Sequence, residues 1–195
     1  MRESPEVLRP KVLTQAHNNS VFSSVSSSVS SSVSSSSFAA NSINSREAVL
    51  DWLKMNVPEP RIRHILRVEQ TAIALADHHH LDVQKAAQAG LMHDLAKYFN
   101  SDRLLQMAKA EGLELTEIDE ANPHLLHADV GAIVARDEFG VTDVEVLDAI
   151  RHHTLGKPGM SALSCVVYLA DGLEPGRGNT PELEELRRLS RQDLI

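Results

Sequence analysis

The sequence predicts an all-α protein, and three observations support this fold class. Apolar residues recur three and four positions apart along most of residues 45–195, which is the spacing of one face of an α-helix. Aromatic residues make up only 4% of the chain, so the core must be built from Leu, Val, Ile and Ala, which suits helices better than a β-sandwich. The sequence also contains no convincing strand pattern.

Residues 1–44 differ in composition from the rest and are expected to form a disordered, low-complexity tail. Residues 19–37 are mostly Ser, with a Val at every fourth position from Val21 to Val33. That spacing also allows a helix with a valine stripe, but Ser competes for backbone hydrogen bonds and one stripe buries little apolar surface. The remaining residues, 45–195, fit one domain with a single core.

The first three predicted helices are separated by clear start and stop signals. Ser45 is a suitable N-cap for a helix over residues 46–55, and Pro58 helps to end that helix. Asp82 is placed to cap the third helix. The predicted helices, in chain order, span residues 46–55, 61–79, 83–99, 101–111, 123–139, 144–153, 162–171 and 181–194.

The later helices have similar signals. Gly112 closes the fourth helix, and a loop is expected from there to Pro123, which suits the first turn of the next helix. Gly140 ends that helix. Thr142 and Ser161 are expected to cap the two helices that follow, and a proline opens the last one.

Composition also excludes several classes of protein. A formal net charge of −8 argues against general affinity for nucleic acid or anionic membranes. No segment approaches the roughly 20 apolar residues that span a bilayer. Cys165 is the only cysteine, which excludes an internal disulfide and fits a reducing cytoplasm, so a cytoplasmic protein is expected. The Ser-rich start is similar to a transit peptide, but Glu3 and Glu6 argue against one.

Four residues on three predicted helices indicate a metal site: His64, the adjacent His93 and Asp94, and Asp171. Imidazoles and carboxylates bind first-row divalent metals, and a metal open to solvent activates water for hydrolysis. Each residue lies in an apolar segment, where ionisable groups are costly unless they are paired or hold a metal. Singly, each also has a structural explanation: a hydrogen-bonded His–Asp pair, a structural histidine, or an aspartate that caps a neighbouring helix.

Two basic residues are placed to join this group. Lys97 lies three residues beyond Asp94 and four beyond His93, so a continuous helix would put it on the same face. Arg61 lies three residues before His64 and is expected to face the same pocket. Positive charges beside a metal site are suited to holding phosphate.

Longer strings around these residues make the pattern more specific. The chain resembles the HD-domain metal-dependent phosphohydrolases, and among them the bacterial YqeK-type symmetrical bis(5'-nucleosyl)-tetraphosphatases. The resemblance extends from about Ser45 to the C-terminus. It is carried by the strings RxxHxxRV, AGLMHDLAKYF, LLHADVGA and AIRHHTLGKPGMSALSCVVYLADGLEPGR.

The resemblance implies an HD-domain helical bundle over residues 45–195 with a metal bound by His64, His93, Asp94 and Asp171. The ion implied is a divalent or trivalent metal, iron in the first place, with manganese or another divalent metal as alternatives. Asp94 and Lys97 are the catalytic residues that the resemblance implies. The expected reaction is the symmetrical cleavage of diadenosine tetraphosphate into two molecules of ADP.

The resemblance also implies a set of residues around the nucleotide phosphates. Within it, His127 and His153 are open to three roles: positioning phosphate oxygens, protonating the leaving diphosphate, or joining a second metal site. The implied substrate-binding residues are Arg61, His64, Lys97, Tyr98, Phe99, Asn100, His127, His153, Thr154, Asp171 and Arg177.

Other functions stay open at this point. One is an HD phosphatase that acts on nucleoside monophosphates or other phosphoesters. Another is a non-catalytic module that senses nucleotides or binds a partner. The family usually continues past the position of Ile195 with a helix that helps to line the nucleotide site, so truncation or weaker binding of the second nucleotide half is expected. A homodimer is expected if an apolar helix face stays uncovered.

Overall fold

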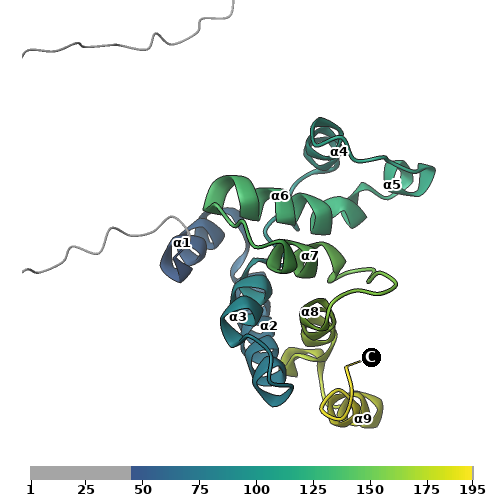
Figure 1. Ribbon diagram of the computed structural model, residues 1–195. Helices are drawn as coiled ribbons and strands as arrows, with labels where there is room; N and C mark the ends of the chain where they lie inside the picture. The colour runs from purple at the N-terminus through teal and green to yellow at the C-terminus, as the bar shows by residue number, and fades with distance from the viewer. Residues whose placement is uncertain (1–44, 195) are drawn as a thin grey trace, which may run out of the picture. The chain divides into compact units, whose positions relative to one another are not determined.

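A computed structural model describes residues 45–194, and the predicted tail, residues 1–44, lies outside this range. Within it the chain forms α-helices and short 3₁₀ turns without a strand, which confirms the all-α prediction (Figure 1). No helix in the described range is long and apolar enough to cross a membrane. The elements are α1 (Arg46–Asn56), α2 (Glu59–His78), α3 (Val83–Met92), α4 (Ser101–Ala110), α5 (Glu117–Ala121), η1 (Pro123–Leu126), α6 (His127–Phe139), α7 (Val144–His152), α8 (Ala162–Leu173), η2 (Pro175–Arg177) and α9 (Pro181–Leu189).

The core forms where α2, α3, α7 and α8 pack together, with α6 against α7 (Figure 1). Small residues let α2 and α3 approach closely: Ala72, Ala86 and Ala89 are fully buried. A Cβ atom added to Gly90 would lie 3.1 Å from the Cα atom of Glu69 on α2. Gly90 is therefore required by the close contact of these helices, which holds two of the segments that build the site at a fixed separation.

Several predicted helix starts are confirmed by side-chain caps. The hydroxyl of Ser45 accepts from the amide of Ala48, and Asp82 and Ser161 cap α3 and α8 in the same way. Thr142 was predicted to cap α7, but it is not the N-cap of this helix. Asp143 caps α7 instead, because its Oδ1 atom accepts from the amides of the second and third residues of the helix.

Two predicted helices begin or end elsewhere. The helix expected over residues 83–99 ends at Met92, and the following residues form tight turns in which Leu95 N donates to Met92 O and Lys97 N to Asp94 O. The ring of His93 donates from Nδ1 to the carbonyl of Gly90 (2.7 Å), so a side chain takes an acceptor that a continuing helix would use. The prediction that residues 93, 94 and 97 share one helix was therefore wrong.

The segment from Gly112 to Pro123 was expected to be a loop, but it contains α5, which begins at a reciprocal capping box between Thr116 and Asp119. The helix expected from Pro123 begins as the 3₁₀ turn η1, and α6 starts only at His127. These boundaries place His127 at the first position of a helix that leads toward the core.

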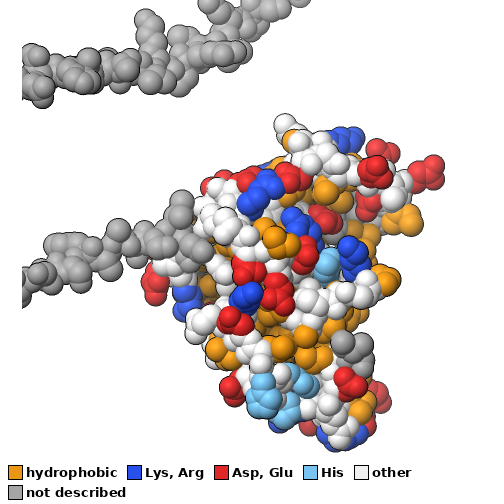
Figure 2. All heavy atoms as spheres, viewed as in Figure 1, with side chains coloured by type: hydrophobic (Ala, Val, Ile, Leu, Met, Phe, Trp, Pro, Cys, Tyr) orange, Lys and Arg blue, Asp and Glu red, His pale blue; other side chains and the backbone are white. Residues whose placement is uncertain are grey.

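The end of the described chain is fastened to the end of α2. The rings of His78 and His79 donate to the carbonyls of Arg191 (2.6 Å) and Ser190 (2.7 Å), which follow α9. Figure 2 shows histidine side chains gathered on the surface at this end of the helices. Helix α9 is thereby held beside α2 and the C-terminal end of α8.

Candidate metal centre

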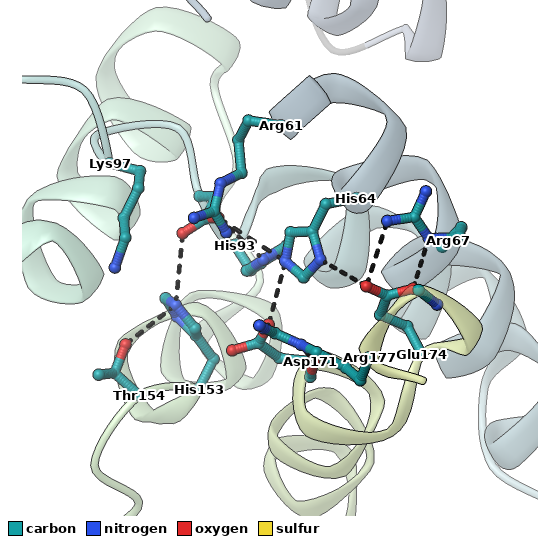
Figure 3. A network of polar contacts seen from close by, with 12 residues as sticks. Arg61, His64, Arg67, His93, Lys97, His153, Thr154, Asp171, Glu174 and Arg177 are labelled. Carbon is teal, nitrogen blue, oxygen red and sulfur yellow. Dashed lines mark hydrogen bonds and ion pairs between the residues drawn. The ribbon is translucent and has the colours of Figure 1, made fainter. Parts of the chain in front are cut away.

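The four residues predicted as metal ligands converge from α2, the turn after α3, and α8 (Figure 3). His64, His93 and Asp94 are buried, and Asp171 is partly buried. The Nε2 atom of His64 lies 3.0 Å from Asp171 Oδ1, and the Nε2 atom of His93 lies 3.4 Å from Asp94 Oδ2. Donor atoms of His64, His93 and Asp94 all lie within 4.8 Å of one another. The structure thus brings the predicted set together.

The protonation of His93 and His64 fits a metal. A carbonyl oxygen only accepts, so Nδ1 of His93 donates to Gly90 O (2.7 Å), and Nδ1 of His64 lies 3.0 Å from Glu174 Oε1. Both Nε2 atoms face the cluster, and within residues 45–194 neither makes a hydrogen bond. When Nδ1 of His64 carries the ring proton, His64 Nε2 and the Asp171 Oδ1 atom 3.0 Å away are both acceptors, and a cation between them would stabilise the pair. The donor set therefore fits a metal ion.

The carboxylates of the cluster are ionised at neutral pH. Burial acts most strongly on Asp94 and raises its pKa, but His93, His153 and Arg61 together outweigh burial and hold the pKa well below its usual range. Asp171 follows the same pattern: burial raises its pKa, and neighbours led by His64 lower it further than burial raises it. Anionic oxygens are the ligands that a divalent ion needs from these residues.

A second donor set shares Asp94. Oδ1 of Asp94 lies 3.5 Å from His127 Nε2 and 3.7 Å from His153 Nε2, whereas Oδ2 faces His64 and His93. The two Nε2 atoms of His127 and His153 are 3.2 Å apart. Asp94 thus lies between two pairs of imidazoles, one pair on each carboxylate oxygen.

His127 and His153 are held in the same way as His93. Their Nδ1 atoms donate to the carbonyls of His124 (2.6 Å) and Ile150 (2.7 Å), three residues earlier in each case. Burial lowers the pKa of His153 to about 3, and burial with the neighbouring Lys97 lowers that of His127. Both rings are therefore neutral at pH 7 and direct lone pairs toward Asp94 and the Thr154 hydroxyl, which lies 3.0 Å from His153 Nε2.

Positive side chains surround the cluster, as predicted. Arg61 donates to Asp94 Oδ2 (3.0 Å), Arg177 to Asp171 Oδ1 (2.6 Å), and Lys97 to His127 Nε2 (3.3 Å). Figure 3 shows Lys97 to the left of the histidines and Arg177 below His64, beside Asp171. A cavity of about 300 Å³ opens beside Arg61 and Arg177, and its wall includes Tyr98. Anionic groups of a ligand would meet cations on more than one side of the cluster.

The structure gives two of the other predicted binding residues a structural role. Phe99 packs against the core with its ring 6.4 Å from that of Trp52, and Asn100 caps α4 by accepting from Arg103 N. Tyr98 is half exposed at the cavity. A substrate contact from these three residues remains a prediction.

Two residues of the site were missed by sequence reasoning. Glu174 is buried and accepts from His64, and Arg67 forms an ion pair with Glu174. Burial raises the pKa of Glu174, but Arg67, His64 and the amide of Gly176 outweigh it and lower the pKa to about 2. Arg67 lies three residues after His64 on α2, so helical spacing was a signal that could have found it, whereas Glu174 follows α8 in a polar turn and its position in the sequence carried no such signal.

Comparisons with known proteins agree with this geometry. The family model of the HD domain matches residues 61–176. The chain is 41% identical to a Bacillus subtilis (strain 168) protein named "Bis(5'-nucleosyl)-tetraphosphatase, symmetrical", over 77% of this chain and 80% of that protein. A Staphylococcus aureus (strain NCTC 8325 / PS 47) protein of the same name is 34% identical over 70% of each chain.

A solved structure also matches. It is a Clostridium acetobutylicum protein described as a predicted HD superfamily hydrolase involved in NAD metabolism, with a TM-score of 0.74 and 39% identity over 77% of this chain and 79% of that one. The matched segment includes the predicted ligands from His64 to Asp171. This chain therefore belongs to the HD-domain family, in the group that contains the relatives named symmetrical bis(5'-nucleosyl)-tetraphosphatase.

Proposed function

We propose that this protein is a metal-dependent hydrolase that cleaves diadenosine tetraphosphate symmetrically into two molecules of ADP. The observation that carries the proposal is the position of Asp94, with two imidazoles on each oxygen and cations around them. Relatives that bear the name of this activity match most of the chain. The site would combine a bound divalent metal with the cationic side chains of Arg61, Lys97 and Arg177, which suit a polyphosphate.

The metal would be held by His64, His93, Asp94 and Asp171. When bound, such an ion supplies a Lewis acid that polarises a phosphoryl oxygen and makes a water molecule more acidic. We propose iron as the resident ion, following the family resemblance, with manganese as an alternative. Metal analysis of the purified protein identifies the ion and shows whether one or two ions are bound per chain.

The protein's own residues would supply charge and positioning. Phosphoryl transfer depends on positioning and on neutralising the charge of the transferred group. Arg61, Arg177 and Lys97 contact different residues of the cluster, so the phosphates of a bound tetraphosphate would meet cations from more than one direction. The neutral rings of His127 and His153 accept from the Lys97 ammonium and the Thr154 hydroxyl through Nε2, so they would orient these two donors beside the transferred phosphoryl group.

Product identification tests the proposal. The purified protein is incubated with Fe²⁺ or Mn²⁺ and diadenosine tetraphosphate, and the nucleotides are separated by chromatography. ADP is expected as the sole product. Release of AMP with ATP would indicate asymmetric cleavage, and inorganic phosphate from a nucleoside monophosphate would indicate a phosphatase instead. Tight binding of ADP without turnover would support a non-catalytic nucleotide-binding module.

Replacing Lys97 with Met is expected to weaken catalysis without removing the metal. Nζ of Lys97 contacts His127 rather than a predicted metal ligand. A lost charge-assisted contact costs about 1.5–3 kcal/mol, which corresponds to roughly 10- to 150-fold in kcat/KM. Steady-state kinetics and Mn²⁺ titration measure the two effects. The control is Lys157→Met in the loop before α8, and equal losses in both variants would contradict the role of Lys97.

The assembly of the protein is a separate proposal. We propose a homodimer, because Leu186 and Leu189 on α9 expose 49% and 42% of their surface. Light scattering at several concentrations measures the mass in solution. A mass of one chain at all concentrations would contradict the dimer.

A further inference from the structure

We propose that Glu174 is the positioning residue that makes His64 a metal ligand, and that Arg67 and Arg187 hold Glu174 in place from outside the metal centre. The proposal rests on the metal-dependent function proposed above. It assigns a role to three residues that belong neither to the predicted metal ligands nor to the predicted substrate-binding residues. Figure 3 shows Glu174 between His64 and Arg67, on the far side of the imidazole from the cluster.

Glu174 follows directly after α8 and is 1% exposed. Its Oε1 atom accepts from His64 Nδ1 (3.0 Å) and from Arg67 Nη2 (3.3 Å). Its Oε2 atom accepts short hydrogen bonds from Arg67 Nε and the amide of Gly176. Both oxygens are therefore engaged, and the carboxylate cannot rotate away from His64 without breaking these contacts.

The contact with Glu174 decides which nitrogen of His64 carries the proton. A neutral imidazole has one N–H, and two carboxylates compete for it: Glu174 at Nδ1 and Asp171 at Nε2, each 3.0 Å away. With the proton on Nδ1, the Nε2 lone pair faces the cluster and can bind a metal. With the proton on Nε2, that lone pair is lost. Two arginine contacts and a backbone amide hold Glu174 in the position that favours the first arrangement.

Arg187 fixes the segment that carries Glu174. From α9, its Nε donates to Leu173 O (2.9 Å), and its Nη2 donates to Gly178 O (2.8 Å) and Glu174 O (3.3 Å). One guanidinium thus joins both ends of the turn over residues 173–178. The same turn contains Arg177, which donates to Asp171. Helix α9 therefore acts on the metal centre through this turn, without contributing a ligand to it.

The chain offers a matched control for Glu174. Glu69 on α2 is also buried, at 2% exposed, and also forms a two-bond ion pair with an arginine, Arg46 (2.7 and 2.8 Å). Among the described residues, both carboxylate oxygens of Glu69 are engaged by Arg46 rather than by a histidine of the cluster. Removing either carboxylate leaves an arginine without its partner in a similar environment, so the two positions differ in the link to His64 and in the Gly176 amide that Glu174 also accepts from.

The test measures the affinity of the full-length protein for Mn²⁺ by calorimetry, in the absence of nucleotide. Glu174→Ala is expected to weaken Mn²⁺ binding by about 10- to 100-fold, the usual cost of losing an outer partner of a ligating histidine. Glu174→Gln keeps an acceptor for His64 and should recover part of this loss. Glu69→Ala and Glu69→Gln should bind Mn²⁺ like the unmodified protein. Unchanged affinity in Glu174→Ala, or equal losses at both positions, would overturn the proposal.

A second readout requires no metal. Long-range ¹H–¹⁵N spectra of the metal-free protein report which ring nitrogen of His64 is protonated. The unmodified protein should show the proton on Nδ1, and Glu174→Gln should shift the population toward Nε2. If Glu174→Ala does not fold, the comparison of the two Gln variants by this readout still decides the proposal. Proton on Nε2 in the unmodified protein would contradict it.

The role of α9 is tested by replacing two neighbouring arginines of this helix, one at a time. Arg187→Gln should weaken Mn²⁺ binding severalfold, whereas Arg188→Gln should not, since among residues 45–194 the guanidinium of Arg188 pairs with Glu185 on the same helix and not with the turn that carries Glu174. Equal affinities would exclude the contribution of Arg187. None of these measurements depends on the substrate, so a failure to cleave diadenosine tetraphosphate would refute the proposed reaction and leave the role of Glu174 to be decided by metal binding.

Discussion

Replacing Asp94 with Asn is expected to remove both metal binding and hydrolysis. Asp94 is the residue that faces both donor sets, with Oδ1 toward His127 and His153 and Oδ2 toward His64 and His93. Asn keeps one oxygen but replaces the other with an NH₂ group, which repels a cation. We expect a loss in kcat/KM of more than about 100-fold, since the removal of an outer-shell partner alone costs up to about that factor.

The measurements are metal content after dialysis and kinetics with diadenosine tetraphosphate. Asp129→Asn is the matched control, because Asp129 is a partly buried aspartate on α6 that belongs to none of the donor groups. This control should keep its metal and its activity. Circular dichroism of both variants separates loss of the site from loss of the fold. An Asp94→Asn protein that retained full metal content would show that the ligand set is wrong.

Local signals were sufficient to predict most helices. Ser45, Asp82 and Ser161 cap helices as expected because a side-chain oxygen that reaches the first free amides acts within four residues of sequence. The end of α3 was missed because its signal is the ring of His93, which bonds back to Gly90. An apolar helical pattern continues through this point, so periodicity alone could not reveal the break.

The site could be predicted in part for a related reason. His64, His93, Asp94 and Asp171 stand out because ionisable residues are rare in apolar segments, and the family resemblance selected the same four. Glu174 was missed because it follows a helix in a polar turn, where a glutamate is ordinary. Only the packing of α8 against α2 shows that its carboxylate meets a histidine 110 residues away.

The second large effect is expected in the pH dependence of folding stability. Burial lowers the pKa of His153 to about 3 in the folded protein, against an ordinary value of 6.5 for a histidine side chain. As the pH falls below about 6.5, the unfolded chain binds a proton at this position while the folded chain does not. The stability that the neutral ring contributes is therefore complete above pH 6.5 and is lost progressively down to pH 3.

His93 has the opposite effect on the pH dependence of folding stability. Burial lowers its pKa, but Asp94 outweighs burial and the net shift is upward, so its contribution is present at low pH and declines as the pH rises. The pKa values of the carboxylates Asp94, Asp171 and Glu174 are lowered in the folded protein. Their contributions to stability are therefore lost only below the ordinary pKa of a carboxyl group, after the His153 contribution has begun to fall. A single variant at His153 is therefore needed to isolate its share.

We expect His153→Gln to flatten the stability profile of the metal-free protein between pH 6.5 and pH 4. At about 1.4 kcal/mol per pH unit, the His153 contribution lost over the full window is at most about 5 kcal/mol. Urea unfolding in the presence of a chelator, repeated at several pH values, gives the two profiles. His124→Gln, an exposed histidine in η1, should follow the unmodified protein. Parallel profiles for the unmodified protein and His153→Gln would mean that this ring titrates alike in the folded and unfolded chains, and that its burial against His93 and His127 does not keep it neutral.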